Sequence, residues 1–168
     1  GNLMRREDVT RIAAEFAGVV VVDEAYIDFA AAESVITELP NLPNLVVLQT
    51  FSKAWAMAGL RVGMAFASSE IISLMNRVKP PYNVSGIAQG AVLDAFEKHR
   101  DVEAWISKTL DERSRIVASL ARFEFVLEIY PSDANFVLVR TTDAKAIYTF
   151  LVEEKIVVRD RSNVQFCA

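Results

Sequence analysis

Two short runs of apolar residues constrain the fold of this chain more than any other feature of its sequence. Residues 19–22 are four consecutive valines, and residues 45–48 form a second run of the same apolar kind. A continuous run of this length is typical of a strand buried on both faces, as in a parallel sheet. Polar residues follow directly, at Asp23 and at Gln49. The pattern predicts two buried strands whose carboxyl ends carry polar side chains.

The segments around these runs predict an α/β chain in which helices and strands alternate. Apolar residues recur at helical spacing over residues 5–16, and Gly18 ends that helix before the first strand. A domain boundary is expected near residues 82–85, which divides the chain into regions 1–84 and 85–168. The remaining helical segments are expected near residues 34–39, 70–77, 85–98, 102–122 and 143–154, and the remaining strands at 61–67, 125–129, 135–139 and 156–158.

Composition and charge argue against several classes of function. The chain has 168 residues and a formal net charge of −4, whereas nucleic-acid binding needs a surplus of clustered Lys and Arg. The one histidine, His99, lies in a charged stretch, and the one cysteine, Cys167, cannot form an internal disulfide, so no metal site is expected. No membrane-spanning run or signal peptide is visible, which predicts a cytoplasmic protein.

The carboxyl ends of the two predicted strands gather residues that suit pyridoxal phosphate (PLP). Ligands bind at such strand ends in α/β sheets. PLP needs a lysine that forms an imine, a carboxylate against its ring nitrogen, a hydroxyl near its ring oxygen, and cations or hydroxyls around its phosphate. The sequence offers Lys53, Asp23 and Tyr26 for the first three, and Ser52 and Arg61 for the phosphate.

Each of these residues also has an ordinary structural explanation. An acidic pair that begins a loop, here Asp23 and Glu24, commonly only solvates that loop. A single lysine such as Lys53 is more often a surface residue, Arg61 could form a structural ion pair, and Tyr26 could belong to the core. Short motif matches have real false-positive rates. It is the order of the residues along the chain that favours a shared site.

That order resembles the fold-type I PLP aminotransferases. The resemblance rests on Val-Val-Asp-Glu-Ala-Tyr ending at Tyr26, on Ser-Lys-Ala at 52–54, and on Gly-Leu-Arg-Val-Gly at 59–63. It extends over essentially the whole chain and implies part of a large PLP-binding domain with a mostly parallel sheet (1–84), followed by most of a small α+β C-terminal domain (85–168). Four further segments are similar to the histidinol-phosphate branch of the family, at residues 25–29, 51–55, 79–84 and 158–161.

The resemblance implies a role for each cofactor-binding residue. Lys53 would hold PLP as a Schiff base and move the proton between the substrate and the cofactor. Asp23 would bind the ring nitrogen and Tyr26 the ring oxygen, while Ser52 and Arg61 would bind the cofactor phosphate.

A sixth residue, Arg159, matches a family arginine that helps to hold the phosphate of the substrate. A surface ion pair with Asp160 or another neighbour explains Arg159 equally well on sequence alone.

The implied activity is transfer of an amino group between histidinol phosphate and 2-oxoglutarate, in histidine biosynthesis, by a homodimeric enzyme. Two alternatives remain open. The first is another PLP enzyme of the same fold, such as threonine-phosphate decarboxylase or an aromatic aminotransferase. The second is a non-catalytic α/β binding module. Family members are considerably longer than this chain, so we expect a C-terminal fragment, truncated at its end, with little or no activity of its own.

Overall fold

The computed structural model describes residues 1–164, so Cys167 lies outside the described residues. Helices and strands alternate along the first half of the chain, as predicted. The helices are α1 (Arg6–Glu15), η1 (Ile27–Phe29), η2 (Val35–Glu38), η3 (Ala58–Leu60), α2 (Ser69–Val78), α3 (Gly86–Phe96), α4 (His99–Leu120) and α5 (Ala144–Glu153), where η marks a 3-10 helix. The strands are β1 (Val20–Asp23), β2 (Leu45–Thr50), β3 (Gly63–Ala67), β4 (Val126–Ile129) and β5 (Val139–Thr141).

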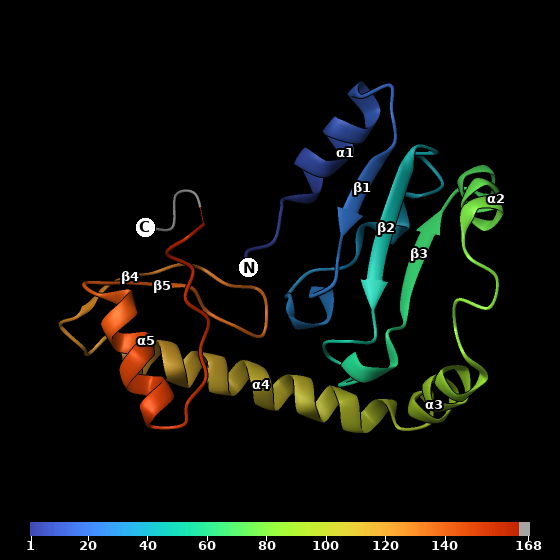
Figure 1. Ribbon diagram of the computed structural model, residues 1–168. Coiled ribbons are helices and arrows are strands. Elements are labelled where there is room, and N and C mark those ends of the chain that lie inside the picture. Colours follow the sequence, from blue (N-terminus) through green and yellow to red (C-terminus); the bar gives the residue numbers. More distant parts are fainter. Residues whose placement is uncertain (165–168) are drawn as a thin grey trace.

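A three-stranded sheet with the order β1-β2-β3 organises the first half of the chain (Figure 1). β1 and β2 are parallel, with Val20 opposite Leu45 and Asp23 opposite Leu48. β3 runs antiparallel to β2. The two strands predicted from the valine and leucine runs are confirmed, and their parallel pairing brings their carboxyl ends to the same edge of the sheet.

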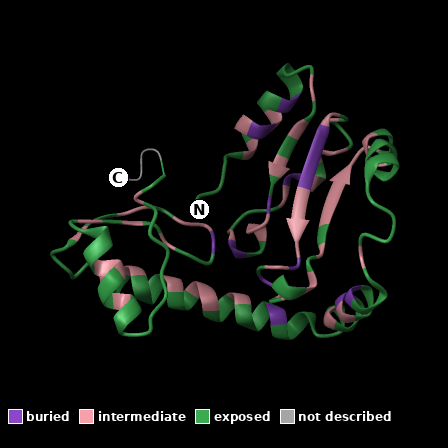
Figure 2. Ribbon diagram, in the orientation of Figure 1, coloured by how far each residue is buried: buried purple, intermediate pink, exposed green. Residues whose placement is uncertain are grey.

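The core of this sheet is centred on the first half of β2, which Figure 2 shows as buried. Leu45 and Val47 are fully buried, and they pack in one cluster with Val9 of α1 and Val35 of η2. Burying a Val or Leu side chain stabilises a fold by about 1.5–3 kcal/mol. The cluster therefore holds α1 and the β1–β2 connection against the sheet.

β1 is less buried than its sequence predicts. Val20 and Val22 are only half-buried, and Val21 is 57% exposed. Within residues 1–164, β1 pairs only with β2, so its other edge is open. The prediction of a strand buried on both faces was therefore wrong for β1, because burial depends on what covers the strand and not on its own composition.

The second half of the chain is a long helix followed by a two-stranded sheet and a short helix. α4 passes below the three-stranded sheet in Figure 1 and contacts η1. β4 and β5, which follow α4 in the chain, pair antiparallel. No helix among residues 1–164 is both long enough and apolar enough to cross a membrane. The domain boundary predicted near residues 82–85 falls in the connection between α2 and α3, and it stays a prediction.

Two strand predictions in this half need correction: the strand expected at 135–139 begins only at Val139, as β5, and the strand expected at 156–158 does not form. Residues 135–138 form a loop before β5, because Ser132 Oγ donates a hydrogen bond to the Phe136 carbonyl and accepts one from Ala134 N. Residues 156–158 form no strand, and Val157 is 84% exposed. Apolar β-branched residues favour strands only where a partner strand is within reach.

Candidate active site

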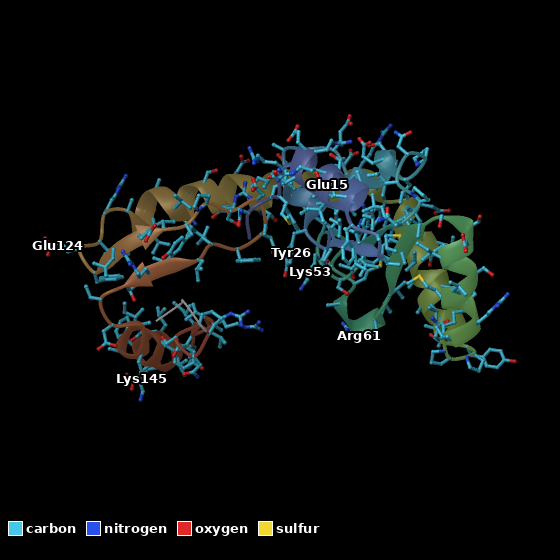
Figure 3. All side chains as sticks on the ribbon, turned by 90° about the horizontal axis from the view of Figure 1, so that it is seen from above. Glu15, Tyr26, Lys53, Arg61, Glu124 and Lys145 are labelled. Atoms are coloured by element: carbon cyan, nitrogen blue, oxygen red, sulfur yellow. The ribbon has the colours of Figure 1, made fainter. Side chains whose placement is uncertain are left out.

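Three of the predicted cofactor-binding residues, Asp23, Tyr26 and Lys53, gather at the edge of the sheet where β1 and β2 end. Asp23 is the last residue of β1, and Lys53 follows the end of β2 by three residues. Lys53 Nζ lies 5.1 Å from the centre of the Tyr26 ring, and Figure 3 shows the two side chains next to each other. The parallel register of β1 and β2 thus brings together residues that are far apart in the sequence.

The turn that carries Lys53 is anchored on both sides of the lysine. Phe51 and Ala54 are buried, whereas the Lys53 side chain is exposed between them. The rings of Phe51, Trp55 and Phe96 pack edge to face, with centres 5.1–5.7 Å apart. Lys53 Nζ makes no ion pair with any residue in the range 1–164, so its amine is available to a ligand.

Asp23, at the same edge, uses only one of its two carboxylate oxygens within the described structure. Its Oδ1 atom accepts a hydrogen bond from Ala25 N at 2.9 Å, which is the usual turn-forming contact of an aspartate. The Oδ2 atom accepts no hydrogen bond within the described part of the chain, and the residue is exposed. Asp23 can therefore accept a hydrogen bond from a protonated nitrogen.

Tyr26 connects this edge to the second half of the chain. Its ring packs edge to face on Phe136, in the loop between β4 and β5, with centres 5.4 Å apart. The same loop holds the first residues of the chain, since Asp133 Oδ2 accepts from Leu3 N at 2.6 Å. A hollow of about 600 Å³ opens beside Asp23 and Tyr26, between β1 and residues 1–6. Asp133 of the loop lines this hollow together with Asp23 and Tyr26, whereas Lys53 does not.

Ser52 and Arg61 each keep donors without a partner in the described structure, and neither forms a hydrogen bond with Asp23, Tyr26 or Lys53 there. Ser52 N donates to Thr50 Oγ1 at 3.0 Å, and its own hydroxyl has no partner in the described structure. Arg61 is exposed and donates to the Ala58 carbonyl at 3.1 Å. Its backbone is left-handed, with φ 56° and ψ 42°, which is uncommon for a residue other than glycine. Figure 3 shows Arg61 beyond Lys53, on the side of β3.

Arg159 lies in the exposed segment that follows α5. The ion pair with Asp160 considered from the sequence does not form, and Arg159 has no other ion-pair partner among residues 1–164. Asp160 instead accepts hydrogen bonds from the hydroxyl and backbone of Ser162, which lower the pKa of its carboxyl. A substrate role for Arg159 stays a prediction.

Sequence reasoning missed two residues at this edge. Glu24 is buried, with 8% of its surface exposed, instead of solvating a loop. Adjacent residues of a strand point to opposite sides. If Asp23 faces the site, Glu24 must face the other way, toward the core, so the strand pattern could have indicated its burial. Phe136 had no signal in the sequence, since its contact with Tyr26 spans 110 positions.

Comparison with known proteins places this geometry in a family. The sequence model of the family "aminotransferase class I and II" matches residues 1–167. The chain belongs to this aminotransferase family. It is also similar to the histidinol-phosphate aminotransferase of Cytophaga hutchinsonii, with 49% identity over 99% of this chain and 48% of that protein.

Solved structures of aminotransferases share the fold. The crystal structure of histidinol-phosphate aminotransferase from Clostridium acetobutylicum matches with a TM-score of 0.86 and 26% identity, over 94% of this chain and 49% of that one. The enzyme from Sinorhizobium meliloti, solved in complex with pyridoxal-5'-phosphate, matches with a TM-score of 0.76 and 26% identity, over 90% and 44%. The mixed α/β fold is thus that of an aminotransferase, and the chain spans about half the length of the relatives it matches.

Proposed function

We propose that this chain contains the cofactor-binding lysine of a PLP-dependent transaminase that acts on histidinol phosphate and 2-oxoglutarate. The observation that carries the proposal is the exposed Lys53 amine beside Tyr26, at the same strand-end edge as Asp23, in a chain of the aminotransferase family. The choice of substrate is supported by relatives named histidinol-phosphate aminotransferase, at 49% and 47% identity.

The chemistry of the donors and acceptors at this edge fits PLP. Lys53 supplies an amine without an ion-pair partner, which can hold the cofactor and move a proton at the substrate carbon. Asp23 Oδ2 can accept from the ring nitrogen, and the Tyr26 hydroxyl can reach the ring oxygen. Ser52 and Arg61 retain donors for the phosphate. Bound PLP would supply the electron sink that amino-group transfer needs.

The remaining features of the proposal concern the substrate, the assembly and the compartment. Arg159 is exposed and would bind the phosphate of the substrate. We further propose that the protein works in histidine biosynthesis, in line with the names of the relatives. We also propose that it is a homodimer and that it lies in the cytoplasm.

Chemical trapping on the lysine tests the cofactor role. Incubation with PLP, reduction with borohydride and peptide mapping should place the label on Lys53. The Lys53→Ala variant should lose this label, whereas Lys145→Ala should keep it, because Lys145 lies on α5, far from Lys53 in Figure 3. Equal labelling of many lysines, or labelling that survives in Lys53→Ala, would instead support a non-catalytic α/β module.

Turnover is a separate test of the reaction. Residues 1–168 span about half the length of their relatives, and we expect little or no transamination of histidinol phosphate with 2-oxoglutarate by this chain alone. Steady turnover by residues 1–168 would contradict that expectation. Product analysis of the full-length protein distinguishes the reactions, because a decarboxylase releases carbon dioxide and a transaminase forms glutamate.

A further inference from the structure

Glu24 is the one charged residue among positions 1–164 whose side chain is buried, with 8% of its surface exposed. It directly follows Asp23, at the point where β1 leaves the sheet. Burying a carboxylate is costly unless hydrogen bonds compensate for the lost water. The partners of this carboxylate therefore show which parts of the structure it holds together.

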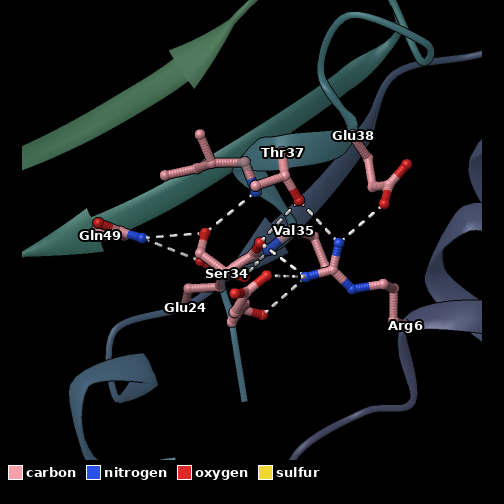
Figure 4. A network of polar contacts seen from close by, with 9 residues as sticks. Arg6, Glu24, Ser34, Val35, Thr37, Glu38 and Gln49 are labelled. Atoms are coloured by element: carbon pink, nitrogen blue, oxygen red, sulfur yellow. Dashed lines mark hydrogen bonds and ion pairs between the residues drawn. The ribbon is translucent and has the colours of Figure 1, made fainter.

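Three donors from two different segments converge on Glu24 (Figure 4). Val35 N donates to Oε1 at 2.8 Å, and both the Ser34 hydroxyl and the Gln49 side-chain amide donate to Oε2, at 2.5 and 3.0 Å. The backbone amide of Glu24 also donates to the Leu48 carbonyl at 2.8 Å. Both carboxylate oxygens are thus satisfied, and they join the end of β1 to β2 and to the start of η2.

We propose that Glu24 is a positioning residue of the candidate cofactor site, which ties the strand end that carries Asp23 to the strand end that leads to Lys53. This inference rests on the proposed function. Adjacent residues of an extended chain point to opposite sides, so anchoring Glu24 inward orients Asp23 outward. Gln49 lies on β2, four residues before Lys53, so its bond to Glu24 also restrains the start of the lysine turn.

The conservative variant Glu24→Gln separates positioning from general stability. When its oxygen accepts from Val35 N, its new amide group cannot accept from the Ser34 hydroxyl or from the Gln49 amide, so the charged side-chain contact between the two strand ends is replaced at most by a neutral one. The matched control is Glu38→Gln. It makes the same chemical change in the neighbouring contact, where Glu38 accepts from Arg6 at 2.8 Å without touching either strand end (Figure 4).

Two readouts are compared, one of them without PLP. Without PLP, Glu24→Gln should speed amide hydrogen exchange in residues 50–57, and Glu38→Gln should not. With PLP, the concentration that gives half-maximal borohydride trapping on Lys53 should rise about tenfold in Glu24→Gln, the effect of losing one hydrogen bond to a charged group. The double variant Glu24→Gln/Gln49→Glu recreates a donor–acceptor pair at the same position and should restore both values.

The outcomes distinguish this inference from the proposed function. If wild type traps PLP on Lys53 and Glu24→Gln matches Glu38→Gln in both readouts, the positioning role is wrong and the proposed function stands. If wild type traps no PLP on Lys53, both fail. Should Glu24→Gln not fold, Gln49→Met removes the donor from β2, with its bonds to Glu24 and to the Ser34 hydroxyl, and leaves the other two donors to Glu24 in place. It serves in the same comparison, with the same expected direction.

Discussion

At the scale of the residue, a single side chain joins the end of α1 to the start of the sheet. The Asn44 amide donates to the carbonyls of Ala13, Phe16 and Gly18, at 2.9, 3.0 and 2.9 Å. The last carbonyls of a helix have no partner within the helix, so a side-chain donor stabilises that end. Asn44 also precedes β2, and its own carbonyl accepts from Val20 N at the start of β1.

Because of these hydrogen bonds, replacing Asn44 should destabilise the fold more than replacing an asparagine whose side chain makes none. We expect Asn44→Ala to lower the free energy of unfolding by about 1–2 kcal/mol, because helix-end carbonyls lose their donor. Asn41→Ala is the control, since the Asn41 side chain is exposed and makes no hydrogen bond in the described structure. Urea denaturation measures both changes, and equal midpoints for the two variants would contradict the capping role.

At the scale of the element, α3 is the support of the lysine turn. Phe96, the last residue of α3, contacts both Phe51 and Trp55, which flank Lys53. Phe123 is equally exposed, at 50% against 48%, but it stacks on one ring only, that of Phe125. The two phenylalanines thus have similar exposure but different ring contacts.

This pair of phenylalanines gives a matched test of that support. An aromatic pair contributes about 0.5–1.5 kcal/mol beyond burial, so Phe96→Ala should lower the free energy of unfolding by about 1 kcal/mol more than Phe123→Ala. Only Phe96→Ala should speed hydrogen exchange at residues 51–57. Exchange that is the same in both variants would show that α3 does not restrain the lysine turn.

At the scale of the whole molecule, much apolar surface meets the solvent. The side chains of Val78, Tyr82 and Ile87 are 82%, 99% and 85% exposed, near and within the connection between α2 and α3. One edge of β1 is also open within the described residues. Exposed apolar patches and open strand edges promote association.

We therefore expect this chain to associate in solution. Sedimentation velocity should show species larger than the monomer, and Val78→Glu/Ile87→Glu should shift the distribution toward the monomer. Ser107→Glu/Ser119→Glu adds the same charge at exposed polar positions of α4, and it should leave association unchanged. A wild-type chain that sediments as a single monomer would refute this expectation.

Sequence and structure each account for a definable part of this protein. The valine and leucine runs were sufficient to predict β1 and β2, because apolar runs and their polar ends are local features. Ser85 was a correct helix start for the same reason, since its hydroxyl accepts from Ala88 N. The predicted strand at 156–158 was wrong, because pairing depends on a partner that local sequence does not specify.

The sequence by itself determined which residues could serve a PLP site, since Asp23 directly follows one apolar run and Lys53 stands five residues after the other, each in a recognisable motif. Only the tertiary structure decided how they meet. The parallel register of β1 and β2 brings Lys53 beside Tyr26, and it turns Glu24 inward while Asp23 faces out. Motifs are read along the chain, whereas distance and burial arise from contacts between segments that the chain brings together only when it folds.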